Sequence, residues 1–313
     1  LGFSYHGGNL SQEAQRLGIR IEEVLDASAS LVPFPLPRPL KKCLKRSLFG
    51  SALRNYPDSS HSAFREVIAS CHGVDSGMVL PGNGAAELFT WAARDAGNIG
   101  ISGLPEPCFG DYVRALRCWN ANYCSHPLSL TWSAKAPQEF PLSPNTEVLW
   151  INNPHNPTGQ LWSVNSIKPL LEKYELVICD EAFLPLVPNG ERQSLIPFVE
   201  SNPNLVVIRS LTKLFGVAGL RLGYAIGTPE RLARWSEWRD PWPVNGLALA
   251  VGTELMQQVA DLDDWIARVQ NWVSKEGSWF QSQLETLPMI IAHPSSVNFF
   301  LIQGEMSLLP LRE

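Results

Sequence analysis

The chain has 313 residues, of which 45% are hydrophobic, including 11 tryptophans and 13 phenylalanines. That apolar content suffices for the core of one large α/β domain with a smaller one, and it excludes a mainly disordered chain. The 25 basic and 30 acidic residues give a net charge of -5 without blocks of like charge, so nothing indicates binding to nucleic acid or to a membrane surface.

The six cysteines form no CxxC pair and no zinc-like spacing with histidine, so we expect no metal site and reduced thiols in a cytoplasmic protein. They are residues 43, 71, 108, 118, 124 and 179. The sequence shows no signal peptide and no apolar stretch as long as a membrane span. It starts with Leu1 instead of Met, so a few residues are expected to precede it.

The first part of the chain, residues 1–55, is expected to be irregular and to wrap over something larger, with a short helix followed by a proline-rich stretch at 33–39. Near its start stands His6-Gly7-Gly8, which is either a simple turn or a mobile flap. In a flap, the two glycines let backbone N–H groups approach an anion closely, and His6 adds a donor.

Two turns follow. Tyr56-Pro57-Asp58 leads into an expected helix over 61–71, and residues 78–88 predict a strand, a glycine-rich turn and a helix. A helix N-terminus with free N–H groups binds phosphate readily, and Gly84 and Ala85 are small enough to leave room for it. The glycines alone are a weak signal, and a plain strand–helix turn explains them equally well.

Two apolar runs, 148–151 and 176–179, are expected to be buried strands. The first leads into a loop over 152–159, whose prolines and glycine give an irregular backbone at the carboxyl end of the strand, where α/β sheets bind ligands. The second ends in Asp180, which taken alone is most simply a cap or a surface charge.

A third apolar run, 205–208, precedes Ser210-Leu211-Thr212-Lys213, and Arg221 follows eight residues after the lysine. A lysine just past a buried strand is an unusual place for a solvated charge. A desolvated amine stays partly neutral and can attack an aldehyde, so Lys213 is a candidate Schiff-base lysine, although an isolated lysine there would most simply be a loop residue. Ser210 and Arg221 can reach one phosphate, the arginine as a bidentate fork.

The last part of the chain shows apolar residues at helical spacing over 266–287, which predict a long helix beside the large domain. Residues 289–291 and 297–302 are expected to be strands of a second, smaller sheet.

The spacing Ser210-x-x-Lys213-x7-Arg221-Leu-Gly-Tyr, together with the Asn-Pro-x-Asn-Pro-Thr-Gly loop at 153–159, resembles the fold type I pyridoxal 5'-phosphate (PLP) enzymes, the aspartate aminotransferase superfamily. The resemblance covers nearly the whole chain. It implies an α/β fold with a mostly parallel central sheet flanked by helices, plus a small C-terminal α/β domain that is cut short here. The resemblance implies three parts: residues 1–55 form an N-terminal arm that contributes to the small domain, residues 56–287 form the large PLP-binding domain, and residues 288–313 form the start of the small domain.

The resemblance also implies roles for individual residues. Lys213 would be the catalytic residue and bind the cofactor, Asp180 would pair with the ring nitrogen, and Asn156 would donate to the phenolic oxygen. The other implied cofactor contacts are Gly84, Ala85, Ser210, Thr212 and Arg221 near the phosphate, Phe109 against the ring face, and Tyr56 from the neighbouring subunit of a homodimer.

Within the superfamily, the His6-Gly7-Gly8 opening, Phe183 in place of a frequent tyrosine, and the Pro-Trp-Pro-Val-Asn segment at 241–245 resemble the L-threonine-O-3-phosphate decarboxylases of cobalamin biosynthesis. These enzymes form (R)-1-amino-2-propanol O-2-phosphate. The resemblance implies a phosphorylated amino-acid or amine substrate, with His6, Gly7 and Gly8 binding it.

Two features depart from the decarboxylase pattern. Its usual Ser-Ala-Asn-x-Asn-Pro is Ser-Ala-Ser-Leu-Val-Pro at 28–33, and the superfamily arginine that holds the substrate carboxylate would lie beyond residue 313. The alternative activity is that of a histidinol-phosphate aminotransferase. A non-catalytic PLP-fold binding protein is a more distant alternative, and a nucleotide-binding module built on Gly82-Asn83-Gly84 is the most distant.

Overall fold

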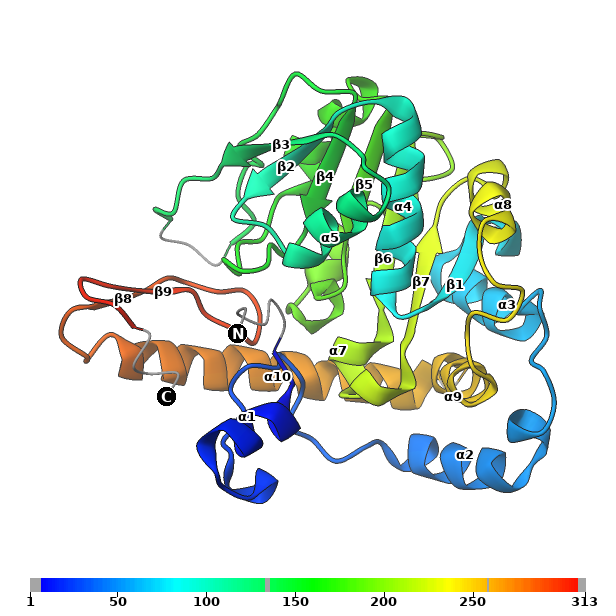
Figure 1. Ribbon diagram of the computed structural model, residues 1–313, viewed down its shortest axis with the longest axis horizontal. Helices are drawn as coiled ribbons and strands as arrows, with labels where there is room; N and C mark the ends of the chain where they lie inside the picture. Colours follow the sequence, from blue (N-terminus) through cyan, green and yellow to red (C-terminus); the bar gives the residue numbers. More distant parts are fainter. Residues whose placement is uncertain (1–6, 133–135, 258, 309–313) are drawn as a thin grey trace.

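The computed structural model describes residues 7–132, 136–257 and 259–308, and it contains a seven-stranded sheet and a separate two-stranded sheet (Figure 1). The large sheet has the strand order β1-β7-β6-β5-β4-β2-β3. Its strands are β1 (Val79–Asn83), β2 (Ser102–Glu106), β3 (Tyr123–Pro127), β4 (Val148–Asn152), β5 (Leu176–Asp180), β6 (Leu205–Ser210) and β7 (Leu222–Ile226). Only β7 runs against its neighbours, so the mostly parallel sheet expected from the sequence is confirmed.

Both faces of this sheet are buried, because successive side chains of a strand point to opposite faces. In β4, Val148 and Trp150 pack into one hydrophobic cluster, and Leu149 and Ile151 pack into the other. The first cluster is covered by α4 (Ala85–Ile99), α5 (Gly110–Cys118) and α8 (Pro229–Glu237).

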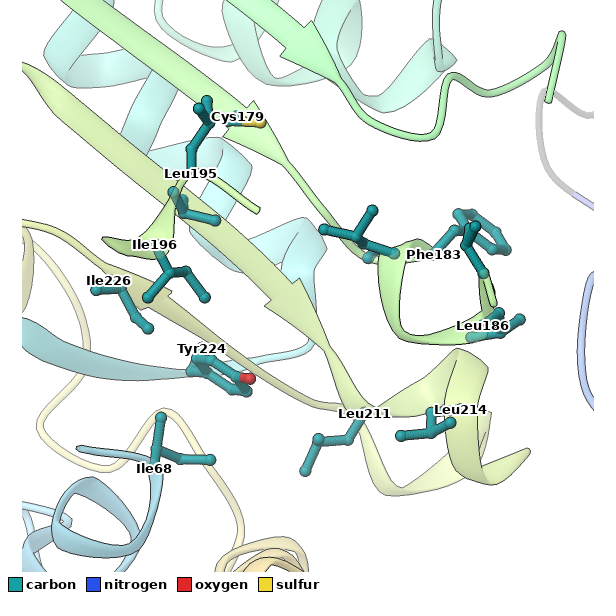
Figure 2. Packing of buried hydrophobic residues seen from close by; sticks show 14 of the residues in the cluster. Ile68, Cys179, Phe183, Leu186, Leu195, Ile196, Leu211, Leu214, Tyr224 and Ile226 are labelled. Carbon is teal, nitrogen blue, oxygen red and sulfur yellow. The ribbon is translucent and has the colours of Figure 1, made fainter. Parts of the chain in front are cut away.

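The second face is covered by helices from distant parts of the chain. They are α2 (Arg38–Phe49), α3 (Ser62–His72), α7 (Leu211–Phe215), α9 (Gly246–Gln257) and α10 (Val259–Leu284), and the short α6 (Val164–Ile167) adds Val164 and Ile167 to the same cluster. Among the described residues, α1 (Leu10–Leu17) contributes to neither cluster. Figure 2 shows part of this packing, with Ile68 of α3 close to Tyr224 of β7. Within the described residues, no helix combines the length and the apolar character that crossing a lipid bilayer requires.

Two expectations about local structure are wrong. Residues 1–55 are not irregular throughout, because α2 places Leu40, Cys43 and Ser47 on one buried face, and its proline lies in the first turn, where no N–H partner is needed. The strand expected over 297–302 begins only at its last residue, in β9 (Ile302–Gly304), which pairs antiparallel with β8 (Ile290–Ala292). Before β9, the Leu301 carbonyl accepts a hydrogen bond from the His293 N–H at 3.0 Å, whereas the Ser296 N–H donates to the carbonyl of Gly159 at 2.9 Å.

A buried ion pair joins the carboxyl ends of β5 and β6. Arg209 lies 2.7 Å from Glu181 and 2.8 Å from Glu191, and both Arg209 and Glu181 are buried. Glu181 also accepts hydrogen bonds from the Leu195 N–H at 2.7 Å and the Ser194 hydroxyl at 2.9 Å. The two strand ends that carry Asp180 and Ser210 are therefore tied together by charge as well as by the sheet.

Glu181→Ala should lower the free energy of unfolding by about 3 kcal/mol, because removing one member of a buried pair leaves a buried charge poorly compensated. Urea denaturation measures this loss. Arg16→Ala is the control: Arg16 pairs with Glu13 at 2.8 Å on the surface of α1, and its loss should change stability by less than about 1 kcal/mol. Equal losses in the two variants would contradict a stabilising role for the buried pair.

Candidate functional site

The predicted site residues converge because several strands end at the same edge of the sheet. β1, β4, β5 and β6 run in the same direction, so their carboxyl ends share one edge, and the antiparallel β7 begins there. The register pairs Asn152 with Asp180 across β4 and β5. It also pairs Gly223 with both Gly82 of β1 and Ser210 of β6. Segments far apart in sequence thus meet at this edge, where open α/β sheets bind ligands.

Lys213 lies at this edge on α7, directly after β6. Its Nζ is 5.1 Å from the centroid of the Phe183 ring. Burial lowers the pKa of the Lys213 amine below its usual range; the negative charge of Asp180 opposes this shift and Arg221 adds to it. An amine in such surroundings is easier to deprotonate than a surface lysine, as a nucleophile requires.

Asp180 provides a buried carboxylate close to that amine. The side chain of Asp180 is 4% exposed. Its Oδ2 accepts a hydrogen bond from the Tyr112 hydroxyl at 2.5 Å, and its Oδ1 accepts one from the Ala182 N–H at 2.9 Å. Burial raises the pKa of the Asp180 carboxyl to about 6, whereas these two donors and Lys213 act to lower it. Near neutral pH the group is therefore an anion that a cationic partner would stabilise further.

A cup suited to an anion lies beside the lysine. The Arg221 guanidinium packs against Gly84, where a Cβ would stand 2.5 Å from its Nη2. Gly84 has φ +75° and precedes α4, so the free N–H groups of the first turn, starting at Ala85, lie next to the arginine. On the other side, a Cβ on Gly223 would stand 2.9 Å from the nitrogen of Ala85. Small residues thus keep the helix N-terminus, β7 and Arg221 in close contact.

Ser210 and Thr212 complete the turn between β6 and the lysine. Ser210 is the N-cap of α7, and its hydroxyl accepts a hydrogen bond from the Thr212 N–H at 3.3 Å. Both side chains are buried at the carboxyl edge of the sheet. The hydroxyl of Ser210 can also donate, so the cap leaves it able to bind an anion.

The loop at 152–159 is held by its own polar side chains. Asn152 accepts a hydrogen bond on Oδ1 from the Asn156 N–H at 2.7 Å and donates from Nδ2 to the Asp180 carbonyl at 3.1 Å. Asn156 is half-buried and is thereby linked through Asn152 to the end of β5. Phe109, the N-cap residue of α5, is half-buried and meets the Tyr112 ring edge-on, with 5.6 Å between centroids.

The remaining predicted residues are not part of this cluster of contacts. The Tyr56 side chain is 78% exposed and stacks on Trp242, with 4.3 Å between ring centroids. Gly7 and Gly8 lie against Ser28, whose hydroxyl accepts a hydrogen bond from the Gly8 N–H at 2.8 Å. His6 lies outside the described residues.

Tyr112 and Asn152 contribute to the site, although no sequence motif assigned them to it. Tyr112 was hidden in a helix among other aromatic residues, and its partner Asp180 is 68 positions away. Asn152 offered a usable signal, because a polar side chain ending a buried strand needs a hydrogen-bond partner. In the sequence, Phe183 stands out only because the family often has tyrosine there; the structure adds that its ring lies next to the Lys213 amine.

The chemistry of this donor set fits the cofactor implied by the sequence. PLP carries an aldehyde, a phosphate and a basic ring nitrogen. The Lys213 amine, whose pKa is lowered, would match the aldehyde, and the cup lined by Arg221 and backbone N–H groups would match the phosphate. The buried carboxylate of Asp180 would match the ring nitrogen. Within the described residues no group of three or more histidine, cysteine, aspartate or glutamate side chains is arranged to hold a metal ion.

Comparisons with known proteins agree with this chemistry. The model of the family described as aminotransferase class I and II matches residues 22–306. The chain is 30% identical to the threonine-phosphate decarboxylase of Salmonella typhimurium, over 96% of this chain and 82% of that protein. It is also 30% identical to histidinol-phosphate aminotransferase 1 of Dechloromonas aromatica, over 82% of this chain and 70% of that protein.

Solved structures share the fold. The L-threonine-O-3-phosphate decarboxylase from Porphyromonas gingivalis has a TM-score of 0.76 at 24% identity, covering 90% of this chain and 82% of that one. The histidinol-phosphate aminotransferase from Sinorhizobium meliloti, in complex with pyridoxal-5'-phosphate, has a TM-score of 0.81 at 17% identity, covering 98% and 81%. At these identities the likeness confirms the fold alone.

Gly84→Ala should weaken binding of PLP roughly tenfold or more, because the new Cβ displaces the Arg221 guanidinium and a charge-assisted hydrogen bond is lost. Titration of protein stripped of cofactor measures the affinity. Gly73→Ala is the matched control: Gly73 has φ +66°, and a Cβ there meets nothing within 4 Å. It places a side chain at positive φ away from the site and should keep its affinity for PLP, although its left-handed backbone (ψ 34°) is less strained by a side chain than that of Gly84 (ψ 165°). An equal loss of affinity in both variants would contradict the cup.

Proposed function

The chain belongs to the aminotransferase class I and II family, and on that basis we propose that it is a PLP-dependent enzyme that decarboxylates L-threonine O-3-phosphate to (R)-1-amino-2-propanol O-2-phosphate, a step of cobalamin biosynthesis. The observation that carries the PLP assignment is the meeting of Lys213, Asp180 and Arg221 at one edge of the sheet. The choice of reaction is supported by the identity to a threonine-phosphate decarboxylase over 96% of the chain.

The chain's own residues would bind, orient and move protons. When bound, PLP supplies an electron sink for the charge that develops at the substrate Cα. Asp180 would hold the ring nitrogen in its protonated form, and Asn156 would donate to the phenolic oxygen. Arg221, with the N–H groups that start at Ala85, would bind the phosphate.

Lys213 would hold the cofactor covalently through its Nζ, and the same Nζ would donate a proton to the substrate Cα. The Phe183 ring lies beside this amine, with its centroid 5.1 Å from Nζ. Since phenylalanine has no hydroxyl, this position cannot provide the hydrogen bond to the phenolic oxygen that a tyrosine would.

The N-terminal segment would select the phosphorylated substrate. Gly7 and Gly8 lie against Ser28, which leads into the 28–33 stretch that corresponds to the substrate-contacting part of the decarboxylases. With His6, the two glycines would bind the substrate phosphate, the Gly8 N–H exchanging its Ser28 acceptor for a phosphate oxygen. That binding energy would orient the carboxylate for loss. We assign residues 1–55 to this arm, 56–287 to the large domain and 288–313 to the start of the small domain.

An aminotransferase of the histidinol-phosphate type is the second candidate. It is favoured by the 30% identity to such an enzyme from Dechloromonas aromatica. The two activities need the same cofactor residues and differ in which substituent of Cα is held in the reacting position. The decarboxylase is preferred because the His6-Gly7-Gly8 opening and Phe183 resemble that branch of the family.

Incubation with threonine phosphate, with and without 2-oxoglutarate, distinguishes the candidates. Release of carbon dioxide without an amino acceptor is the expected result. Glutamate formed from histidinol phosphate and 2-oxoglutarate would establish the aminotransferase instead. A protein that binds PLP but converts neither substrate would point to the non-catalytic alternative.

Lys213→Ala should lower the rate of decarboxylation by roughly 10³-fold or more, because the nucleophile and the proton donor are lost together. It should also abolish covalent attachment of PLP after borohydride reduction, read by mass spectrometry. Lys168→Ala is the control, since Lys168 is an exposed lysine whose Nζ lies over the Phe198 ring at 4.9 Å. Attachment of PLP to a lysine other than Lys213 would overturn the assignment.

A homodimer is the proposed assembly. Large apolar side chains are exposed shortly before Tyr56 in the chain, and Tyr56 is the residue that the family resemblance assigns to the subunit boundary; they are Leu48, Phe49 and Leu53, and Trp242 is exposed as well. Exposed large apolar side chains that form one patch are typical of an interaction site, so we propose that these residues belong to one interface. Because Tyr56 stacks on Trp242, these two side chains belong to the same exposed surface.

Phe49→Glu should weaken dimerisation at least tenfold, because a charge would be buried in the interface, while the fold should persist since the Phe49 side chain is 93% exposed. Analytical ultracentrifugation across a range of concentrations measures the effect. Leu25→Glu is the control, because Leu25 is equally exposed, at 93%, but lies outside this surface. Dimers of unchanged affinity in Phe49→Glu would exclude this interface.

A further inference from the structure

We propose that Tyr112 is a positioning residue whose hydroxyl orients the Asp180 carboxylate and keeps it ionised for the ring nitrogen of the cofactor. This inference rests on the proposed function, since it concerns the residue assigned there to the ring nitrogen. It adds a group that the family motifs do not include, supplied by α5 instead of by the strand ends.

The hydrogen-bond geometry at Asp180 is well suited to this role. The Tyr112 hydroxyl donates to Oδ2 at 2.5 Å, and the Ala182 N–H donates to Oδ1 at 2.9 Å. One donor on each oxygen fixes the plane of the carboxylate. Because each carboxylate oxygen accepts two hydrogen bonds, the group still has capacity for a further donor such as a protonated ring nitrogen.

Tyr112 itself has little freedom to move. It is completely buried, and its ring meets those of Phe89 and Phe109 edge-on, at centroid distances of 5.1 Å and 5.6 Å, and that of Trp150 at 5.2 Å. The aromatic cluster holds the hydroxyl in one place. The Tyr112 hydroxyl therefore holds Oδ2 of Asp180 in place, although Tyr112 belongs to α5 and not to the sheet.

The charges around Asp180 explain why a donor is needed. Burial disfavours its anion most strongly, and the adjacent Glu181, just after β5, adds to this. The charge of Lys213 on α7 stabilises the anion and lowers the pKa of Asp180, and Arg221 in turn lowers the pKa of the Lys213 amine. Burial and the charge of Asp180 raise the pKa of the Tyr112 hydroxyl well above its usual value, with smaller contributions from the thiols at 108 and 179. Tyr112 thus remains protonated and can donate at every pH where the enzyme would work.

The alternative is that Tyr112 contributes only packing and one ordinary hydrogen bond. Tyr174 provides a matched comparison for that case. It is also buried, and its hydroxyl donates to the backbone carbonyl of Pro144 at 2.8 Å. Its acceptor has no titratable charge, so removing this hydroxyl should cost stability without changing any pH dependence.

The first test uses the full chain stripped of cofactor. The folded-state pKa of Asp180, about 6, is above its ordinary value, so the folded protein binds more protons and loses stability as pH rises towards 6. Tyr112→Phe removes a donor to the anion and should raise the proton affinity of Asp180 roughly tenfold or more, so this loss should continue above pH 6. Urea denaturation should then show a difference between Tyr112→Phe and the parent chain that grows from pH 5 to pH 8. The difference for Tyr174→Phe should stay constant. A constant difference in both variants would overturn the proposal.

The second test uses the enzyme loaded with cofactor. In Tyr112→Phe, the pH dependence of kcat/KM and of the visible absorbance of the bound cofactor should both shift from those of the parent, with Tyr174→Phe unchanged. Unshifted profiles in Tyr112→Phe would overturn the positioning role. Failure of the proposed function has a separate signature: borohydride would not attach PLP to Lys213 in the parent chain, whereas the measurement without cofactor would still report on Tyr112 and Asp180.

Discussion

A carboxylate that must remain charged away from water imposes the strongest constraint on this protein. Burying an ionised group is costly unless it is hydrogen-bonded and paired. Asp180 meets this condition with donors from two different segments, the Tyr112 hydroxyl of α5 and the Ala182 N–H just beyond β5. The amine of Lys213 provides the opposite charge. The strand carrying Asp180 can therefore be fully buried and still end in a group capable of chemistry.

The rest of the site follows from how the sheet is built around that strand. Parallel strands place their carboxyl ends at one edge, and the single reversed strand, β7, brings Arg221 back to the same edge from the opposite direction. The close approach of β7 to α4 depends on Gly84 and Gly223, where a side chain would collide with Arg221 or with the backbone of the helix. A second buried pair, Arg209 with Glu181, ties the neighbouring strand ends together, so that Asp180 and Ser210 hold their relative positions.

Differences between expectation and structure occur where contacts link distant segments. The helix α2 was missed because prolines dominate the sequence before it, although its buried face is regular once packed. Of the strand expected over 297–302, only the end pairs, with Ile302 opposite Ala292 of β8, and the chain enters this stretch from Ser296, which is bound to Gly159 in the loop after β4. Tyr112 was missed because nothing local distinguishes a tyrosine that donates to a carboxylate from one that fills a core.

By itself, the sequence determined the class of fold and the family, and it predicted most of the residues that would bear the chemistry. Apolar runs ending in Asn152, Asp180 and Ser210 are local patterns, and the topology of a parallel sheet then requires their ends to meet. Only the tertiary structure decided which side chains surround Lys213 and Asp180 and how strongly each group holds its proton. Burial and hydrogen bonding set those properties, and both arise from contacts such as Tyr112 with Asp180, whose members are 68 positions apart in the chain.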